Sequence, residues 1–331
     1  MWGCEIALRP YSFCNLCELN VSNVIDQEDL NKRASVAAFF GTLQAGFTDL
    51  HYLRPIWKQT TEKDALIGVG MTGIASNVVT KLNLQETAEV VKSTNEKIAK
   101  IIGINKAARN TTIKPSGTTS CVLGTSSGIH AWHNDYYIRR IRIMKNDPLY
   151  IYLINNHPEL VEDDKLRSHD TAVIAIPQKA PKGSILRTET ALDLLERTKK
   201  FNLEWVKEGH RKGANTNNVS ATISLDKSRL YGFSKGKFYD GVVKEDHTSY
   251  DEWKMAGEWI WENRYTFNGL SVLPYDSGSY IQAPFEDCTE VEYNEMMKTL
   301  KDIDLRKVVE TEDNTDLTGE VACAGGACEL K

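Results

Sequence analysis

Cysteines are the residues of this sequence that most directly indicate chemistry. The chain ends in VACAGGACELK, which places Cys323 and Cys328 five positions apart with two glycines between them. The polar run VETEDNTDLTGE before this pair has too little apolar surface to offset the entropy of ordering. We therefore expect a dithiol on a flexible C-terminal tail, residues 310–331.

A second group of reactive side chains lies near the N-terminus. Glu5 precedes Cys14 by nine residues, and Cys14 and Cys17 have C-x-x-C spacing. A carboxylate and a thiol that converge could transfer a proton and donate electrons to one substrate. Alternatively, these two cysteines and the two of the tail could surround one zinc ion, as in a zinc-binding dithiol protein. The residues alone leave both interpretations open, together with an exposed glutamate beside a buried cysteine.

The stretch IKPSGTTS has the composition of an anion-binding loop. It runs from a predicted strand into a turn with a lysine, a glycine and several hydroxyls. Backbone N–H groups and hydroxyl donors of this kind can hold a phosphate. An ordinary strand-to-helix turn is the alternative, and a phosphate-binding module without catalytic activity is also compatible with the loop.

The stretch GVGMTG matches the dinucleotide-binding pattern G-x-G-x-x-G at Gly68, Gly70 and Gly73. The preceding TTEKDALI offers almost no strand, which that pattern requires. We therefore predict that the glycines allow close packing at the start of a helix and do not bind a dinucleotide.

The elements that must position these groups alternate along the chain. Apolar periodicity predicts helices over 26–47 and 83–103. Further candidates are strands at 110–115, 138–143, 171–177, 218–224 and 270–274, and helices at 190–209 and 250–265. This order predicts an α/β fold with parallel strands, interrupted by a surface insertion at about 226–249.

Composition restricts the class of protein. The chain has 331 residues, 41% hydrophobic and 26% charged, which is enough for a substantial core. A net charge of −5 gives no general attraction to nucleic acid or membrane surfaces. No apolar run is long enough to span a bilayer and no signal sequence is visible, so we expect a cytoplasmic protein. In the reducing cytosol, structural disulfides are rare, so seven cysteines indicate redox or metal chemistry.

Five motifs, in this order, resemble the C-terminal half of a ribonucleotide reductase catalytic subunit. They are CEIALRPYSFCNL, IGVGMTGIA, KPSGTTSCVLGTSSGIHAWHNDYYIRRIRI, GLSVLPYDSGSYIQAPFE and CAGGAC. The likeness covers nearly the whole chain apart from the insertion. Metal-subunit-dependent members of this family carry a tandem tyrosine pair shortly before the tail, and no such pair follows Tyr280 here. The resemblance therefore favours the adenosylcobalamin-dependent class.

The resemblance implies a role for each motif. Glu5 matches the glutamate that accepts the 3′-hydroxyl proton of the substrate, and Cys14 matches one member of the reducing cysteine pair. The loop that matches the phosphate-binding segment comprises Lys114, Pro115, Ser116, Gly117, Thr118 and Thr119. Cys323 and Cys328 would re-reduce the active-site disulfide and be reset by thioredoxin or glutaredoxin.

The resemblance also implies the fold and a partner. Residues 1–309 would form the second half of a ten-stranded α/β barrel, followed by the redox tail. In the family the radical-bearing cysteine lies two residues before the glutamate, where this chain has Gly3, with Cys4 beside the acid. We therefore expect this chain to be the downstream piece of a split or truncated subunit that works with an N-terminal half.

Overall fold

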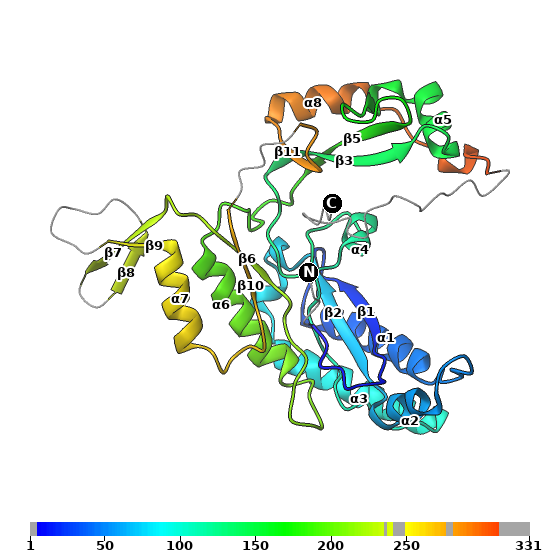
Figure 1. Ribbon diagram of the computed structural model, residues 1–331, viewed down its shortest axis with the longest axis vertical. Helices are drawn as coiled ribbons and strands as arrows, with labels where there is room; N and C mark the ends of the chain where they lie inside the picture. The colour runs from blue at the N-terminus through cyan, green and yellow to red at the C-terminus, as the bar shows by residue number, and fades with distance from the viewer. Residues whose placement is uncertain (1–4, 235–236, 241–248, 276–280, 311–331) are drawn as a thin grey trace. The chain divides into compact units, whose positions relative to one another are not determined.

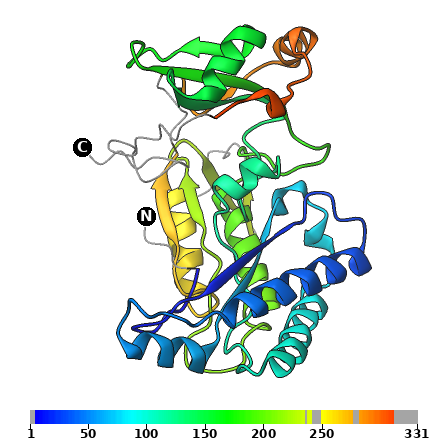
Figure 2. The same cartoon turned by 90° about the vertical axis from the view of Figure 1, so that its right-hand side faces the viewer.

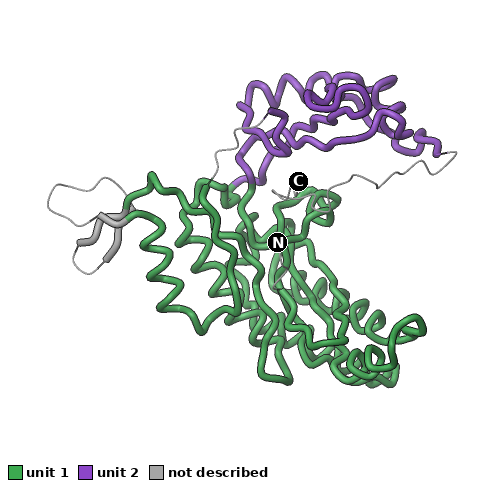
Figure 3. Tube along the Cα trace, in the orientation of Figure 1, with its two compact units in different colours: residues 1–132, 183–275 green, residues 133–182, 276–331 purple. Residues whose placement is uncertain are grey.

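A computed structural model describes residues 5–234, 237–240, 249–275 and 281–310 (Figure 1). The chain divides into two compact units, residues 1–132 with 183–275 and residues 133–182 with 276–331 (Figure 3). The predicted redox tail with Cys323 and Cys328, as well as Gly3 and Cys4, lies outside the described residues. The domain boundary after residue 309 therefore stays a prediction. No described helix is long and apolar enough to cross a membrane.

The first unit contains most of the elements. Its strands are β1 (Asn15–Asn20), β2 (Ile67–Thr72), β6 (Thr222–Leu225), β7 (Leu230–Ser234), β8 (Lys237–Asp240), β9 (Ser249–Asp251) and β10 (Ser271–Pro274). Its main helices are α1 (Gln27–Ala45), α2 (Pro55–Asp64), α3 (Leu84–Ile102), α6 (Ala191–Phe201) and α7 (Glu252–Glu262). Shorter helical segments are η1 (Ile74–Ser76), η2 (Val79–Lys81), α4 (Thr118–Val122) and the π-helical turn η4 (Asn202–Val206).

Parallel pairing connects five strand segments of this unit. β1 pairs with β2 in parallel, and β6 pairs with β10 in parallel. Between them, Val69 forms a parallel bridge with Thr111, and Ile113 forms one with Val219, the residue that leads into β6. The segment around 109–113 is therefore the middle strand of a five-stranded parallel arrangement. The predicted α/β fold with parallel strands is confirmed for this unit.

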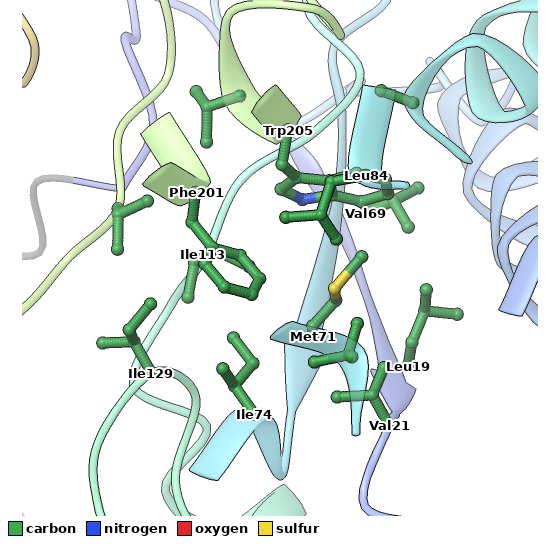
Figure 4. Close-up of a cluster of buried hydrophobic side chains, with 14 of the residues drawn as sticks. Leu19, Val21, Val69, Met71, Ile74, Leu84, Ile113, Ile129, Phe201 and Trp205 are labelled. Atoms are coloured by element: carbon green, nitrogen blue, oxygen red, sulfur yellow. The ribbon is translucent and has the colours of Figure 1, made fainter. Parts of the chain in front are cut away.

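Side-chain alternation gives this sheet two different faces. Leu19, Met71 and Ile113 point into a core that also contains Trp205 of η4 (Figure 4). The Trp205 indole N–H donates to the backbone oxygen of Thr112 at 3.0 Å, which fixes η4 against the middle strand. The residues between these core positions lie on the opposite face, because successive side chains of a strand alternate.

Local signals explain the two long helices that cover the core face. The Asp26 carboxylate caps α1 by accepting from the backbone N–H of Asp29 at 2.9 Å. Asn83 caps α3 in the same way, and Gly103 ends it with a φ of +76°, which glycine adopts without strain. α1 and α3 lie side by side (Figure 2). The helices predicted over 26–47 and 83–103 are confirmed.

The second unit is built on a different sheet. Its order is β11-β3-β5-β4, from β11 (Phe285–Asp287), β3 (Tyr136–Met144), β5 (Thr171–Lys179) and β4 (Val161–Asp163), and all pairs are antiparallel. It also contains α5 (Pro148–Asn156), η3 (Pro158–Leu160), α8 (Glu290–Thr299) and η5 (Leu305–Lys307). The strands predicted at 138–143 and 171–177 exist, but the expectation that they are parallel is wrong. The chain returns through α5 and β4, so that β5 runs antiparallel to both β3 and β4. The strand propensity of a segment does not specify the direction in which it pairs.

Two of the three glycines of GVGMTG occupy a strand. Gly68 and Gly70 are in β2, where the predicted helix start is wrong, whereas Gly73 directly precedes the 3-10 helix η1. The predicted close packing is found at all three glycines. A Cβ at Gly68 would lie 2.5 Å from Cδ2 of Leu16 on the adjacent strand, and one at Gly70 would lie 3.1 Å from Oε2 of Glu18. Each glycine therefore makes room for the larger residue opposite it in the register. Within the predicted insertion, β7, β8 and β9 form a small antiparallel sheet.

Replacing Gly68 by alanine tests this packing. We expect Gly68→Ala to lower the free energy of unfolding by about 1–3 kcal/mol, because the added methyl overlaps Leu16. Gly257 in α7 is the matched control. Apart from its chain neighbours and the backbone of its own helix, no atom lies within 4 Å of its Cβ position, so Gly257→Ala should raise stability by up to about 1 kcal/mol. Urea unfolding followed by tryptophan fluorescence measures both. Equal stability of Gly68→Ala and the wild type would contradict the packing argument.

Candidate active site

Glu5 lies over the face of the parallel sheet that is opposite the core. Its backbone oxygen accepts from Oγ1 of Thr112 at 2.7 Å and from the backbone N–H of Asn218 at 2.9 Å. The next residue, Ile6, would lie 3.1 Å from a Cβ on Gly68. Oε2 of Glu5 is buried and has no hydrogen-bond partner among the described residues. A buried carboxylate oxygen of this kind is available to a substrate hydroxyl.

The segment that joins Glu5 to Cys14 is attached to α2. The Arg9 guanidinium donates to both carboxylate oxygens of Asp64, at 2.7 and 2.6 Å. The Phe13 ring stacks on Trp57 with centroids 4.8 Å apart. A bidentate ion pair and an aromatic stack restrict the segment at two points. The distance between the acid and the thiol is therefore set by tertiary contacts as well as by sequence spacing.

Cys14 directly precedes β1, and the alternation of side chains predicts that its thiol lies on the face opposite the core, within electrostatic reach of Glu5. Burial raises its pKa to about 12, with smaller upward contributions from Cys17 and Glu5 and an opposing one from the Arg109 guanidinium. The thiol is therefore protonated at neutral pH. A neutral, half-buried thiol can deliver hydrogen to a bound substrate, whereas it reacts slowly as a nucleophile because little thiolate is present.

Cys17 belongs to the other face. Its Sγ lies 3.1 Å from the position of a Cβ on Gly41 of α1, and it packs against the hydrophobic core. An odd separation along an extended strand directs Cys14 and Cys17 to opposite sides. The described part of the chain contains no group of three metal-binding side chains. The tail cysteines that the zinc alternative requires lie outside the described residues.

The predicted phosphate loop begins where the middle strand ends. Ser116 is buried, and its Oγ donates to Oε1 of Glu18 at 2.8 Å. The Lys114 ammonium lies 3.5 Å from Oε2 of the same carboxylate. Burial raises the pKa of Glu18, while Lys114 and Ser116 act to lower it. Sequence analysis missed Glu18. Its signal is its position four residues after Cys14, which places both side chains on the same face of an extended strand.

The loop itself turns sharply after Ser116. Gly117 has a φ of +48°, a region that glycine adopts without strain, and its backbone oxygen accepts from Oγ of Ser120 at 2.7 Å. Pro115 and Thr118 are exposed. The following helix α4 has only five residues, too few for a helix dipole of consequence. The loop therefore offers hydroxyls and backbone N–H groups.

Two adjacent asparagines, which sequence analysis did not single out, hold the Glu5 segment in place. Oδ1 of Asn217 accepts from the backbone N–H of Ala7 at 3.2 Å. Asn218 is fully buried, and its side chain donates to the backbone oxygen of Gly269 at 2.9 Å. These amides connect the Glu5 segment, the strand leading into β6 and the chain before β10. The NN pair in NTNNVS could have indicated this role. It directly precedes a predicted strand, and asparagines that become buried there must hydrogen-bond to other parts of the chain.

Comparison with known proteins gives a consistent result. No protein-family model matches the chain. A curated relative named "Probable adenosylcobalamin-dependent ribonucleoside-triphosphate reductase", from Dictyostelium discoideum, is 27% identical and covers 98% of this chain and 39% of the relative. Adenosylcobalamin-dependent ribonucleoside-triphosphate reductases from Euglena gracilis and Lactobacillus acidophilus are each 25% identical, and the matches cover 41% and 44% of them. The chain thus spans about two fifths of the length of these relatives.

A solved structure shares the fold. The crystal structure of a B12-dependent (class II) ribonucleotide reductase matches 89% of this chain and 41% of that chain, with a TM-score of 0.69 and 21% identity. The fold is therefore that of the class II ribonucleotide reductases. The curated relatives are the adenosylcobalamin-dependent ribonucleoside-triphosphate reductases, so the resemblance inferred from the five motifs is confirmed.

Thiol labelling tests the environment of Cys14. With a pKa of about 12, its thiolate fraction at pH 8 is roughly a thousandfold below that of an ordinary cysteine. We expect iodoacetamide to label exposed Cys121 in the native protein long before Cys14, and to label both at similar rates after unfolding in guanidinium. Peptide mass spectrometry measures each site. Equally fast labelling of both cysteines in the native protein would contradict the buried, protonated thiol.

Proposed function

We propose that this chain carries out the substrate reduction of a ribonucleotide reductase, in which ribonucleotides become 2′-deoxyribonucleotides by thiyl-radical chemistry. The observation that supports this proposal is the proximity of Glu5 to Cys14. The Glu5 backbone oxygen is hydrogen-bonded to Thr112 on the non-core face of the sheet, and the Glu5 carboxylate contributes to the raised pKa of the Cys14 thiol. The loop from Lys114 to Thr119 begins on that same face, so a nucleotide held by its phosphates would present its ribose to both groups.

The proposed roles follow from the chemistry of each side chain. The Glu5 carboxylate accepts the proton of the 3′-hydroxyl, and the 2′-hydroxyl takes a proton from the cysteine pair and leaves as water. Cys14 and a second cysteine from outside the described residues supply two electrons and become a disulfide. A thiol that stays protonated at neutral pH suits this role, because hydrogen has to be delivered to the sugar.

The tail cysteines return the electrons. We propose that Cys323 and Cys328 reduce the active-site disulfide by thiol–disulfide exchange, become a disulfide themselves and are reset by thioredoxin or glutaredoxin. Each exchange breaks one sulfur–sulfur bond and forms another, so two electrons pass inward in each turnover. The glycines at 325 and 326 suit a segment that must reach two places.

Adenosylcobalamin is the proposed cofactor, because the names of the curated relatives specify it. When bound it would supply the radical that oxidises a cysteine. Three described cysteines of the first unit do not fit that target, because Cys14 is assigned to the reducing pair, Cys17 faces α1 and Cys121 is exposed. Position 3, where the resemblance expects the radical cysteine, is glycine. The roles proposed for Glu5, Cys14 and the phosphate loop do not depend on residues that hold the cofactor.

The proposed partner is the other half of a barrel. We propose that the five parallel segments of the first unit are half of a ten-stranded α/β barrel, with the remaining strands and the radical cysteine supplied by chain outside these 331 residues. A half barrel leaves strand edges and apolar surface without a partner. The isolated chain should therefore self-associate, and adding the other half should make it monodisperse and active.

The shuttle role of the tail can be tested in the reconstituted enzyme. Cys323→Ser should abolish multiple turnover with thioredoxin while preserving a single turnover of the pre-reduced enzyme, because only re-reduction needs the tail. Deoxyribonucleotide formed per active site measures both regimes, with Cys121→Ser as the control for an exposed cysteine. An equal loss of single and multiple turnover would refute the shuttle.

The two cysteines of CNLC form a matched pair for a second test. Cys14→Ala should remove deoxyribonucleotide formation, because the reducing pair is incomplete. Cys17→Ala should retain turnover and lower stability by about 1–2 kcal/mol, because its side chain packs against the core. Turnover assays and thermal unfolding separate the two effects. Loss of turnover in Cys17→Ala with Cys14→Ala still active would invalidate the assignment.

A further inference from the structure

Glu18 is a buried acid that the proposed chemistry does not use. Its side chain is only 5% exposed, and it points from β1 to the same face as Cys14. An uncompensated carboxylate beside a phosphate site would repel the ligand. Its presence there therefore requires a compensating cation.

Both partners of the Glu18 carboxylate belong to the phosphate loop. Ser116 donates its hydroxyl hydrogen to Oε1 at 2.8 Å, across 98 positions of sequence, and the Lys114 ammonium lies 3.5 Å from Oε2. Oε2 is buried and accepts no hydrogen bond among the described residues. The carboxylate thus connects β1 to the beginning of the loop at two points.

The sheet is shaped to let this connection form. Glu18 is opposite Gly70 in the register of β1 and β2, and β2 separates β1 from the strand that leads into the loop. A Cβ at Gly70 would lie 3.1 Å from Oε2 and 3.3 Å from Oε1. The carboxylate therefore extends across β2 at Gly70, because glycine has no side chain to occupy that space.

The pair also sets the charge of the loop. The Lys114 side chain is 21% exposed, and its ammonium faces the carboxylate. Opposite charges at this distance in a partly buried site cancel to a large extent. The start of the loop is therefore close to neutral, and its Ser116 hydroxyl has a fixed position.

We propose that Glu18 is a positioning residue that holds Lys114 and Ser116 in the conformation that receives the polyphosphate of the substrate. This inference rests on the proposed function and deepens it, because it names the residue that sets the geometry of the phosphate loop. Glu18 acts through the loop and does not contact the ligand. Its loss should weaken phosphate binding before it affects any other property of the site.

Calorimetric titration of the enzyme reconstituted from this chain and its other half tests this role, with inorganic triphosphate and CTP as probes. Glu18→Gln should weaken the binding of both probes by about tenfold or more, because a charged hydrogen bond and an ion pair are lost. Lys114→Met should also weaken binding, since it leaves the carboxylate uncompensated. The double variant should lose less than the product of the two single losses, a coupling that general destabilisation does not produce.

Glu252→Gln is the matched control. Glu252 is a buried carboxylate of the same unit, paired with Arg229 at 3.5 Å, and its contacts are with α6 and the chain after β6. Its variant should lose stability and keep wild-type affinity for both probes. Wild-type or tighter affinity in Glu18→Gln overturns the inference, as does an equal loss in Glu252→Gln. If the wild type binds neither probe, the proposed phosphate site itself fails and Glu18 with it.

Discussion

Side-chain alternation in the parallel sheet of the first unit is the constraint on which the core and the site both depend. Positions such as Leu19, Met71 and Ile113 fill the core beneath α1 and α3. The intervening positions carry Glu18 and Thr112 on the other face. A shift of register by one residue would bury the acid in the core and expose the apolar residues. The packing of the core face therefore fixes the positions of the site residues on the opposite face.

The acidic groups of the site are largely paired or neutral. The Glu18 carboxylate is paired with Lys114, and the Cys14 thiol remains neutral because burial raises its pKa to about 12. Glu5 keeps one buried oxygen without a partner among the described residues. A site of low net charge that holds one available carboxylate oxygen and one protonated thiol suits a substrate that brings its own negative charge.

Several features could be predicted from sequence because they are local. The helices at 26–47 and 83–103 have capping residues and apolar periodicity within their own residues. Other features depend on contacts across the chain and were missed or wrong. The antiparallel direction of β3 and β5 is fixed by the return of the chain through β4. The strand at Gly68 could not be recognised from its own residues, because its glycines have low strand propensity and pair with larger residues of β1.

The sequence by itself determined the identities and order of the reactive groups, from Glu5 and Cys14 to the loop at Lys114, and through them the resemblance to ribonucleotide reductases. Only the tertiary structure decided which of these groups share a face. It packed Cys17 against α1 and brought Glu18 to the predicted phosphate loop across 98 positions. The physical reason is that the sequence lists the type of each side chain, whereas the distance between two side chains depends on the register of the strands. That register follows from how the whole core packs.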